Sequence, residues 1–178
     1  MKSFVNAQIA SAKKEILDAI QILFRGSSIQ TPGTTEIAAS GSNVALVCGG
    51  DSSTVETIQM FLANLGYQVR TCMTAAESLK SADSPFGIIV IDPSFTDDLE
   101  GAKKLIVRVN AKKAVERRQL FSVLISATQK SMDGNSAFLN GVNLIINKAD
   151  LANFETYIRQ GQQYFQQFYS TIQAISQT

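Results

Sequence analysis

Apolar residues recur along this chain in two different arrangements. Between residues 3 and 25 they return at helical spacing with charged residues between them, which predicts one amphipathic helix within residues 1–25. Residues 26–42 are rich in Gly, Ser and Thr around one Pro, a composition typical of a linker. From residue 43 onward, short apolar runs alternate with helical segments. Residues 43–178 are therefore expected to form one folded domain.

The alternation in residues 43–178 predicts five strands separated by helices. We expect strands at residues 44–48, 67–72, 87–92, 120–126 and 143–147. We expect helices at residues 53–65, 75–81, 99–117 and 151–175, and a short helix or loop at 131–140. The third strand is almost continuously apolar, as is usual for parallel strands covered on both faces. The pattern predicts an α/β fold with a doubly wound, five-stranded parallel sheet.

The composition narrows the chemistry. The chain has no histidine, which excludes histidine-based acid–base catalysis and histidine metal sites. A net charge of +1 argues neither for nor against a nucleic-acid partner. Cys48 and Cys72 are too few for a disulfide framework, and no apolar run approaches the ~18 residues that span a bilayer. We therefore expect a soluble, cytoplasmic protein that does not insert into a membrane.

Polar residues follow the predicted strands at their carboxyl ends. Asp92 ends the third strand, Ser126 ends the fourth, and Lys148 follows the fifth. Because ligands of such sheets bind beyond the carboxyl ends of the strands, these three side chains are expected to converge in one crevice. A carboxylate, a hydroxyl and an ammonium group can together hold a phosphoryl group, with the carboxylate as nucleophile.

Several short motifs surround these residues, namely VALVC, LGYQV, IIVID, VLISA and GVNLIINK. In their order and spacing the chain resembles the receiver domain of bacterial response regulators, over roughly residues 43–160. The resemblance places Asp92 at the phosphoacceptor, Ser126 at the switch hydroxyl and Lys148 at the active-site lysine. It implies a flavodoxin-like sheet in the order 2-1-3-4-5, here with an added N-terminal helix and an extended C-terminal helix.

The chain departs from this family where receivers bind metal. Gly49 and Gly50 stand in place of the acidic pair that holds Mg²⁺, an ion that needs several hard oxygen ligands. Asp51 lies one step further on, where its side chain need not point inward. We therefore expect no tight Mg²⁺ site and no other cofactor. Without a metal, Lys148 is expected to form a direct ion pair with Asp92.

Three further features have alternative interpretations. The Gly49–Ser53 loop can bind an anion or nucleotide through free N–H groups, or it is a tight turn that caps the following helix. Residues 147–150 spell the NKxD motif of GTPases, but the GxxxxGK[ST] loop that must accompany it is missing, so we interpret the match as coincidence. The basic residues of 103–118 form either a solvated helix face or a surface for an acidic partner.

The sequence favours a non-enzymatic pseudo-receiver that acts in signalling or as a scaffold through protein contacts. Its partners are expected to be proteins, including a second copy of the chain bound through the terminal helices, while a nucleic-acid partner is not expected. The first alternative is a receiver that accepts a phosphoryl group on Asp92. The second is a nucleotide or anion binder that uses the Gly49–Ser53 loop.

Overall fold

The computed structural model of this protein describes the backbone of residues 43–176 and the side chains of residues 43–169. The helix predicted in residues 1–25 and the linker predicted at 26–42 lie outside the described residues. Five strands form one parallel sheet: β1 (Val44–Cys48), β2 (Gln68–Cys72), β3 (Ile88–Ile91), β4 (Phe121–Ser126) and β5 (Leu144–Asn147). Their order is β2-β1-β3-β4-β5, which confirms the predicted topology.

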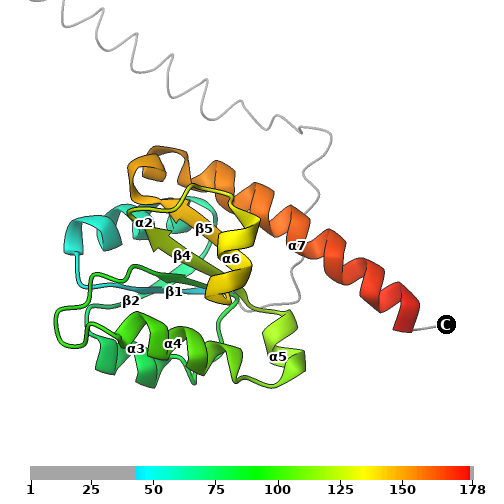
Figure 1. Ribbon diagram of the computed structural model, residues 1–178, viewed down its shortest axis with the longest axis horizontal. Helices are drawn as coiled ribbons and strands as arrows, with labels where there is room; N and C mark the ends of the chain where they lie inside the picture. Colours follow the sequence, from blue (N-terminus) through cyan, green and yellow to red (C-terminus); the bar gives the residue numbers. More distant parts are fainter. Residues whose placement is uncertain (1–42, 177–178) are drawn as a thin grey trace, which may run out of the picture. The chain divides into compact units, whose positions relative to one another are not determined.

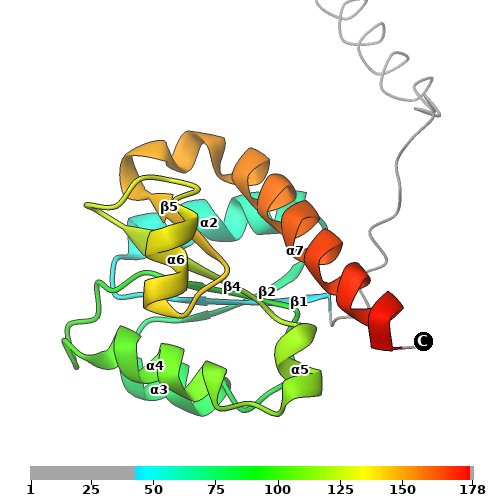
Figure 2. The same cartoon turned by 45° about the vertical axis from the view of Figure 1, so that its right-hand side comes forward.

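Helices cover both faces of this sheet (Figure 1). They are α2 (Ser52–Asn64), α3 (Ala75–Ser81), α4 (Gly101–Asn110), α5 (Ala114–Arg118), α6 (Gly134–Asn140), a 3₁₀ turn η1 (Lys148–Asn153) and α7 (Phe154–Ser176). The helices α2 and α7 lie on one face, and α3 and α4 lie on the other, as a second view also shows (Figure 2). No described helix is long and apolar enough to cross a membrane.

The core consists of two layers because strand side chains alternate between the two faces. Val47 and Val90 pack with the apolar residues of α2 and α7, whereas Leu46 and Ile89 pack with those of α3, α4 and α6. All four residues of β3 are fully buried, as expected for a central parallel strand. Packing of helices on both faces holds the strands in place, and this positions the side chains that follow the carboxyl end of each strand.

The single helix predicted at 99–117 is wrong, because the chain forms two helices there, α4 and α5. The break follows Asn110, whose side-chain amide donates to the Gly141 carbonyl at 2.9 Å and whose oxygen accepts from Arg117 at 2.8 Å. Val109 is the last buried residue of α4, and α5 buries none. Because the residues after Val109 have no buried apolar face, the helix ends at Asn110, where the side chain binds Gly141 at the end of α6.

The C-terminal helix begins three residues later than predicted, at Phe154. The preceding residues form the 3₁₀ turn η1, and the Asn147 side chain caps this turn by accepting from the Ala149 N–H at 2.9 Å. Phe154 is fully buried and stacks on Phe61 of α2. The tight turn therefore leaves Lys148 at the sheet edge and brings the start of α7 into the core.

Candidate functional site

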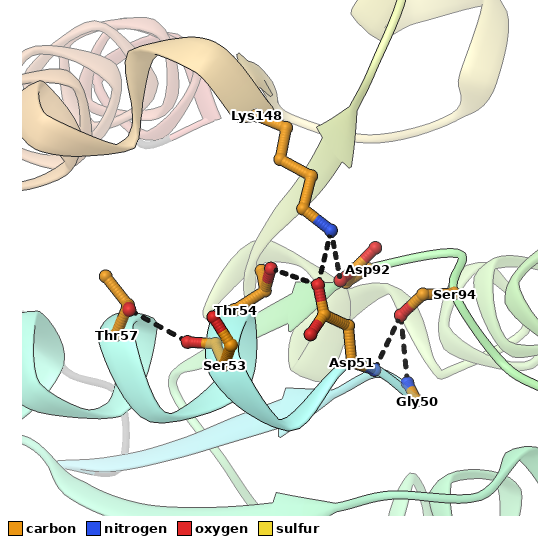
Figure 3. A network of polar contacts seen from close by, with 8 residues as sticks. All are labelled: Gly50, Asp51, Ser53, Thr54, Thr57, Asp92, Ser94 and Lys148. Carbon is orange, nitrogen blue, oxygen red and sulfur yellow. Dashed lines mark hydrogen bonds and ion pairs between the residues drawn. The ribbon is translucent and has the colours of Figure 1, made fainter.

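The residues predicted to converge lie at the carboxyl edge of the sheet, but not as one cluster. Asp92 directly follows β3, Lys148 directly follows β5, and Gly49 to Asp51 connect β1 with α2. Figure 3 shows Lys148 pointing from the β5 end toward Asp51 and Asp92. Parallel strands end at a common edge, and this geometry brings together residues from distant parts of the sequence.

Lys148 binds Asp51 more closely than Asp92. Its Nζ lies 2.7 Å from Asp51 Oδ2 and 3.8 Å from Asp92 Oδ2. The expected direct pair with Asp92 is therefore only the longer of two contacts. The sequence left the direction of the Asp51 side chain open. In the structure, Thr54 Oγ1 in the first turn of α2 donates to Asp51 Oδ2 at 2.7 Å and orients the carboxylate.

The contact between Asp51 and Lys148 shifts both acidities. Hydrogen bonds from Lys148, which has the larger effect, and from Thr54 together lower the pKa of Asp51 to about 2. The same contact with Asp51 raises the pKa of Lys148 above its ordinary value. Each charge favours the charged form of its neighbour, so the pair is ionised across the neutral range.

Asp92 is the most buried charged group of the site. Its side chain is 5% exposed, and Oδ2 has no hydrogen-bond partner among the described residues. A buried carboxylate needs a counter-charge, and the ammonium group of Lys148 supplies one at the ion-pair distance of 3.8 Å. Asp92 is thus an acceptor that the surrounding polypeptide leaves partly unsatisfied.

The loop after β3 closes over the glycine loop. Ser94 Oγ accepts hydrogen bonds from the N–H groups of Gly50 at 3.0 Å and Asp51 at 2.9 Å. Two of the N–H groups that an anion would need therefore already have a partner. Asp51 occupies the N-cap position of α2, as the cap interpretation expected, but its side chain makes no capping hydrogen bond to the backbone.

The two glycines leave no room for side chains at the positions where the resemblance to receivers would place an acidic pair. A Cβ atom on Gly50 would lie 2.3 Å from the Ser94 carbonyl oxygen, and one on Gly49 would lie 2.8 Å from Asp92 Cβ. Real Cβ atoms do not come this close to backbone, so a side chain at position 50 requires the loop around Ser94 to move. The sequence shows that the acidic pair is missing, and the structure shows that its space is filled.

Ser126 has a different role from the one the resemblance implies. Its hydroxyl accepts from the N–H groups of Thr128 at 3.2 Å and Gln129 at 3.0 Å, so it closes the turn after β4. In the described part of the chain, no hydrogen bond joins it to Asp92 or Lys148. Such local bonds from Ser side chains to the backbone are common in turns.

The residues of the NKxD match also have structural partners. Asn147 Nδ2 donates to the Gln129 carbonyl at 2.7 Å, and Ser131 Oγ donates to Asp150 at 2.6 Å. These bonds tie the end of β5 to the loop after β4. They agree with the interpretation of this match as coincidence.

Four of the seven basic residues in the stretch at 103–118 form ion pairs with acids that lie outside or within it. The pairs are Lys103–Glu100, Lys104–Asp98, Arg108–Asp83 and Lys112–Glu116. Exposed pairs of this kind add little stability, but they reduce the positive field that attracts phosphate. The arrangement favours a solvated helix face over a nucleic-acid surface.

These strand-end residues on a doubly wound sheet define a receiver-like fold. It resembles a CheY-like response regulator receiver domain from Methanospirillum hungatei at 17% identity and a TM-score of 0.54, over 71% of this chain and 98% of that one. It also resembles the receiver domain of a sensor histidine kinase from Pseudomonas aeruginosa PAO1, at 18% identity and a TM-score of 0.51, over 70% and 98% of the two chains. An adenylate cyclase structure from Rhodopirellula baltica is also similar, at 19% identity and a TM-score of 0.55, over 77% of this chain and 99% of that one.

No protein-family model matches the sequence, and no curated protein is significantly similar to it. The likeness therefore establishes the fold, and a fold of this kind carries many functions.

The Pseudomonas domain holds a magnesium ion in its active-site cleft, but the residues of this protein do not fit such an ion. Within residues 43–169, no three Asp, Glu, Cys or His side chains are grouped so that they could hold a metal. The ammonium group of Lys148 already binds Asp51 and lies 3.8 Å from Asp92. A cation would have to displace this charge and find further oxygen ligands.

Proposed function

We propose that this protein is a pseudo-receiver, a signalling or scaffold module that acts through protein contacts and does not accept a phosphoryl group. The fold supports a role in signalling, because the similar structures include several receiver domains. The absence of chemistry is our own inference from the site. The inference rests on Gly49 and Gly50, which supply no metal ligands, and on Lys148, whose ammonium group lies beside Asp51 and Asp92.

The observation that carries the proposal is the closure of the β3–α4 loop over Gly50. A side chain there would collide with the Ser94 carbonyl at 2.3 Å, and Ser94 Oγ holds the adjacent N–H groups. In phosphoryl transfer, a metal ion and aligned donors stabilise charge on the phosphoryl oxygens. Here the hydrogen bond of Lys148 goes to Asp51, and its ammonium group lies farther from Asp92, the candidate phosphoacceptor.

The proposal is tested by incubating the full chain with Mg²⁺ and acetyl phosphate and measuring the intact mass. We expect no phosphoryl adduct and no saturable Mg²⁺ binding below millimolar concentration, because the oxygen ligands are missing. Asp92→Asn is the matched control, since it removes the candidate acceptor and nearly preserves its shape. An adduct on the natural chain that is absent from Asp92→Asn would overturn the proposal.

That outcome would favour the first alternative, a receiver that uses Asp92 without the usual metal pair. One observation supports it: Asp92 Oδ2 is buried and has no hydrogen-bond partner in the described residues. A nucleophile needs such a free oxygen, and Lys148 lies close enough to offset charge. Anion binding at Gly49–Ser53 is less well supported, because Ser94 already occupies two of its N–H groups.

We also propose that the protein contacts include a homodimer formed through the terminal helices. On α7, Tyr164 is 66% exposed and Phe168 is 65% exposed, although both are large and aromatic. Exposed aromatic residues close together on one helix often mark an interface. A cytoplasmic location is part of the proposal, because Cys48 and Cys72 are both free, as is usual in a reducing compartment.

A further inference from the structure

The two cysteines of the chain are neighbours across two strands. Cys48 ends β1, Cys72 ends β2, and the two residues are register partners in the parallel pair. Adjacent strands lie about 4.8 Å apart. That spacing falls within the range of about 4.4–6.8 Å between Cα atoms that a disulfide spans. Both side chains also belong to the same core layer, so they are on the same face of the sheet.

The surroundings of the thiols are partly polar. Cys72 Sγ lies 3.4 Å from Ser81 Oγ on α3, and the buried Ser78 is on the same helix. Hydrogen bonding with Cys48 lowers the pKa of Cys72 to about 7, while the same interaction raises the pKa of Cys48. The thiolate is the nucleophilic form of a cysteine, and the lowered pKa favours that form at Cys72 over Cys48.

The two cysteine side chains are buried, but one of them belongs to an edge strand of the sheet. Cys48 is fully buried and Cys72 is 2% exposed. However, β2 is an edge strand, three of its five residues are exposed, and Met73 directly after Cys72 is 36% exposed. Oxidation of Cys72 therefore requires local opening of this edge strand, which admits a small oxidant more readily than a bulky one.

We propose that Cys48 and Cys72 form a redox site in which hydrogen peroxide oxidises the dithiol to an intrachain disulfide. The Cys72 thiolate attacks one peroxide oxygen, the O–O bond breaks, and the leaving hydroxide takes up the proton that Cys72 had released, giving water and a sulfenic acid. The Cys48 sulfur then attacks Cys72 Sγ, and the S–O bond breaks. The leaving hydroxide takes the Cys48 proton and becomes the second water. The protein loses two electrons, and one peroxide is reduced to two waters.

The redox site is joined directly to the glycine loop. The Gly49 N–H donates to the Cys72 carbonyl at 3.0 Å, and Cys48 immediately precedes Gly49. A new covalent link between the two strand ends changes the geometry at the point where this loop begins. We therefore expect the amide resonances of Gly49 and Gly50 to shift on oxidation and to return on reduction.

The test treats the native full chain with hydrogen peroxide, removes the oxidant with catalase, and then unfolds and alkylates the protein with N-ethylmaleimide. We expect the number of alkylated cysteines to fall from two to none and to return to two after a reducing agent. Peptide mapping should show Cys48 linked to Cys72. Two free thiols after treatment, irreversible oxidation, or a disulfide between two chains would each overturn the proposal.

Single-cysteine variants assign the two roles. Cys48→Ser should stop at a sulfenic acid on Cys72 that dimedone traps, whereas Cys72→Ser should react far more slowly. The reverse order of reactivity would overturn the assignment of Cys72 as the attacking thiol. If either variant fails to fold, the experiment on the natural chain still decides whether the disulfide forms. Its result is independent of phosphoryl acceptance, so the two proposals can fail separately.

Discussion

Gly50 is the residue on which the candidate site depends most. Its N–H donates to Ser94 Oγ, and its Cα lies so close to the next loop that no side chain fits. Asp51 follows it and binds both Thr54 and Lys148. Position 50 thus combines a hydrogen bond and a close backbone approach, and it directly precedes the half-exposed ion-pair partner Asp51.

Gly50→Ala should therefore destabilise the domain. Its Cβ would lie 2.3 Å from the Ser94 carbonyl oxygen, and overpacking of this kind costs about 1–3 kcal/mol of unfolding free energy. Gly134→Ala is the matched control, because nothing lies within 4 Å of a Cβ at that position. The control should be neutral or stabilising by up to about 1 kcal/mol. Urea unfolding measures both, and equal effects would contradict the proposed close approach.

At this scale the sequence predicted where some residues lie but not how they interact. Asp92, Ser126 and Lys148 were placed correctly at strand ends, because parallel strands end at a common edge. The role of Ser94 was not predicted, and the sequence left the direction of the Asp51 side chain open. Their partners are 43 to 97 residues distant in the sequence, and no local pattern encodes contacts between loops from different strands.

Among the elements, α7 has two different aromatic faces. Phe165 packs edge-on against Phe121 of β4 and against Tyr169, so it belongs to the core layer that α2 also covers. Phe168 and Tyr164 are mostly exposed. The aromatic residues of α7 are therefore divided between a part packed against the sheet and a part that is mostly exposed.

The exposed part should support self-association. Sedimentation of the full chain is expected to show a dimer, and Tyr164→Ala with Phe168→Ala should raise its dissociation constant at least tenfold. Each aromatic side chain buried at an interface contributes about 1.5–3 kcal/mol, and about 1.4 kcal/mol corresponds to tenfold. The unfolding free energy should change little, because both side chains are exposed.

Val107→Ala on α4 is the control for this experiment, since Val107 is 63% exposed and lies on another helix. It should leave the dimer unchanged. Deletion of residues 1–25 should also weaken the dimer, because the sequence predicts an amphipathic helix in this segment. A full chain that stays monomeric at high concentration would refute the dimer.

The strands were easier to predict than the helix ends. All five predicted strands are present. The central strands are short, mostly apolar runs buried between two helical layers, whereas the edge strand β2 is more polar and three of its five residues are exposed. The break between α4 and α5 was missed, because Asn110 ends the helix through a carbonyl 31 residues away. Helix periodicity continued through the break, and only the tertiary partner reveals it.

At the scale of the whole molecule, the contact between Asp51 and Lys148 joins the segment after the first strand of the sheet to the segment after the last strand. The residues are 97 positions apart, and their contact links the loop after β1 to the residue after β5. It crosses the edge at which β3 and Asp92 also end. Loss of this contact therefore affects the folded state as a whole, not one helix.

The contribution of this contact to stability should depend on pH. The pKa of Asp51 falls from 3.8 to about 2 in the folded state, so its stabilising effect is present above 3.8 and is lost as the pH falls through about 2. The natural chain should be more stable than Asp51→Asn at neutral pH, and this difference should shrink through that window. Urea unfolding across the pH range measures it.

Glu56→Gln serves as the control, because it removes an exposed carboxylate from the same helix without touching this contact. Its difference from the natural chain should stay small throughout. A pH-independent difference for Asp51→Asn would show that the ion pair with Lys148 does not stabilise the fold.

The close approach at Gly50 also constrains how this site can change over evolutionary time. A mutation that places a carboxylate at position 50 creates a steric clash with the Ser94 carbonyl, and this cost arises whether or not a metal binds. The loop that carries Ser94 would have to be rebuilt first, and that change alone gives up two hydrogen bonds. Each change on its own therefore costs contacts of the folded state unless the other has already occurred. Two changes that are costly separately rarely arise together, so we expect this edge of the sheet to vary less over time than the surface of the protein.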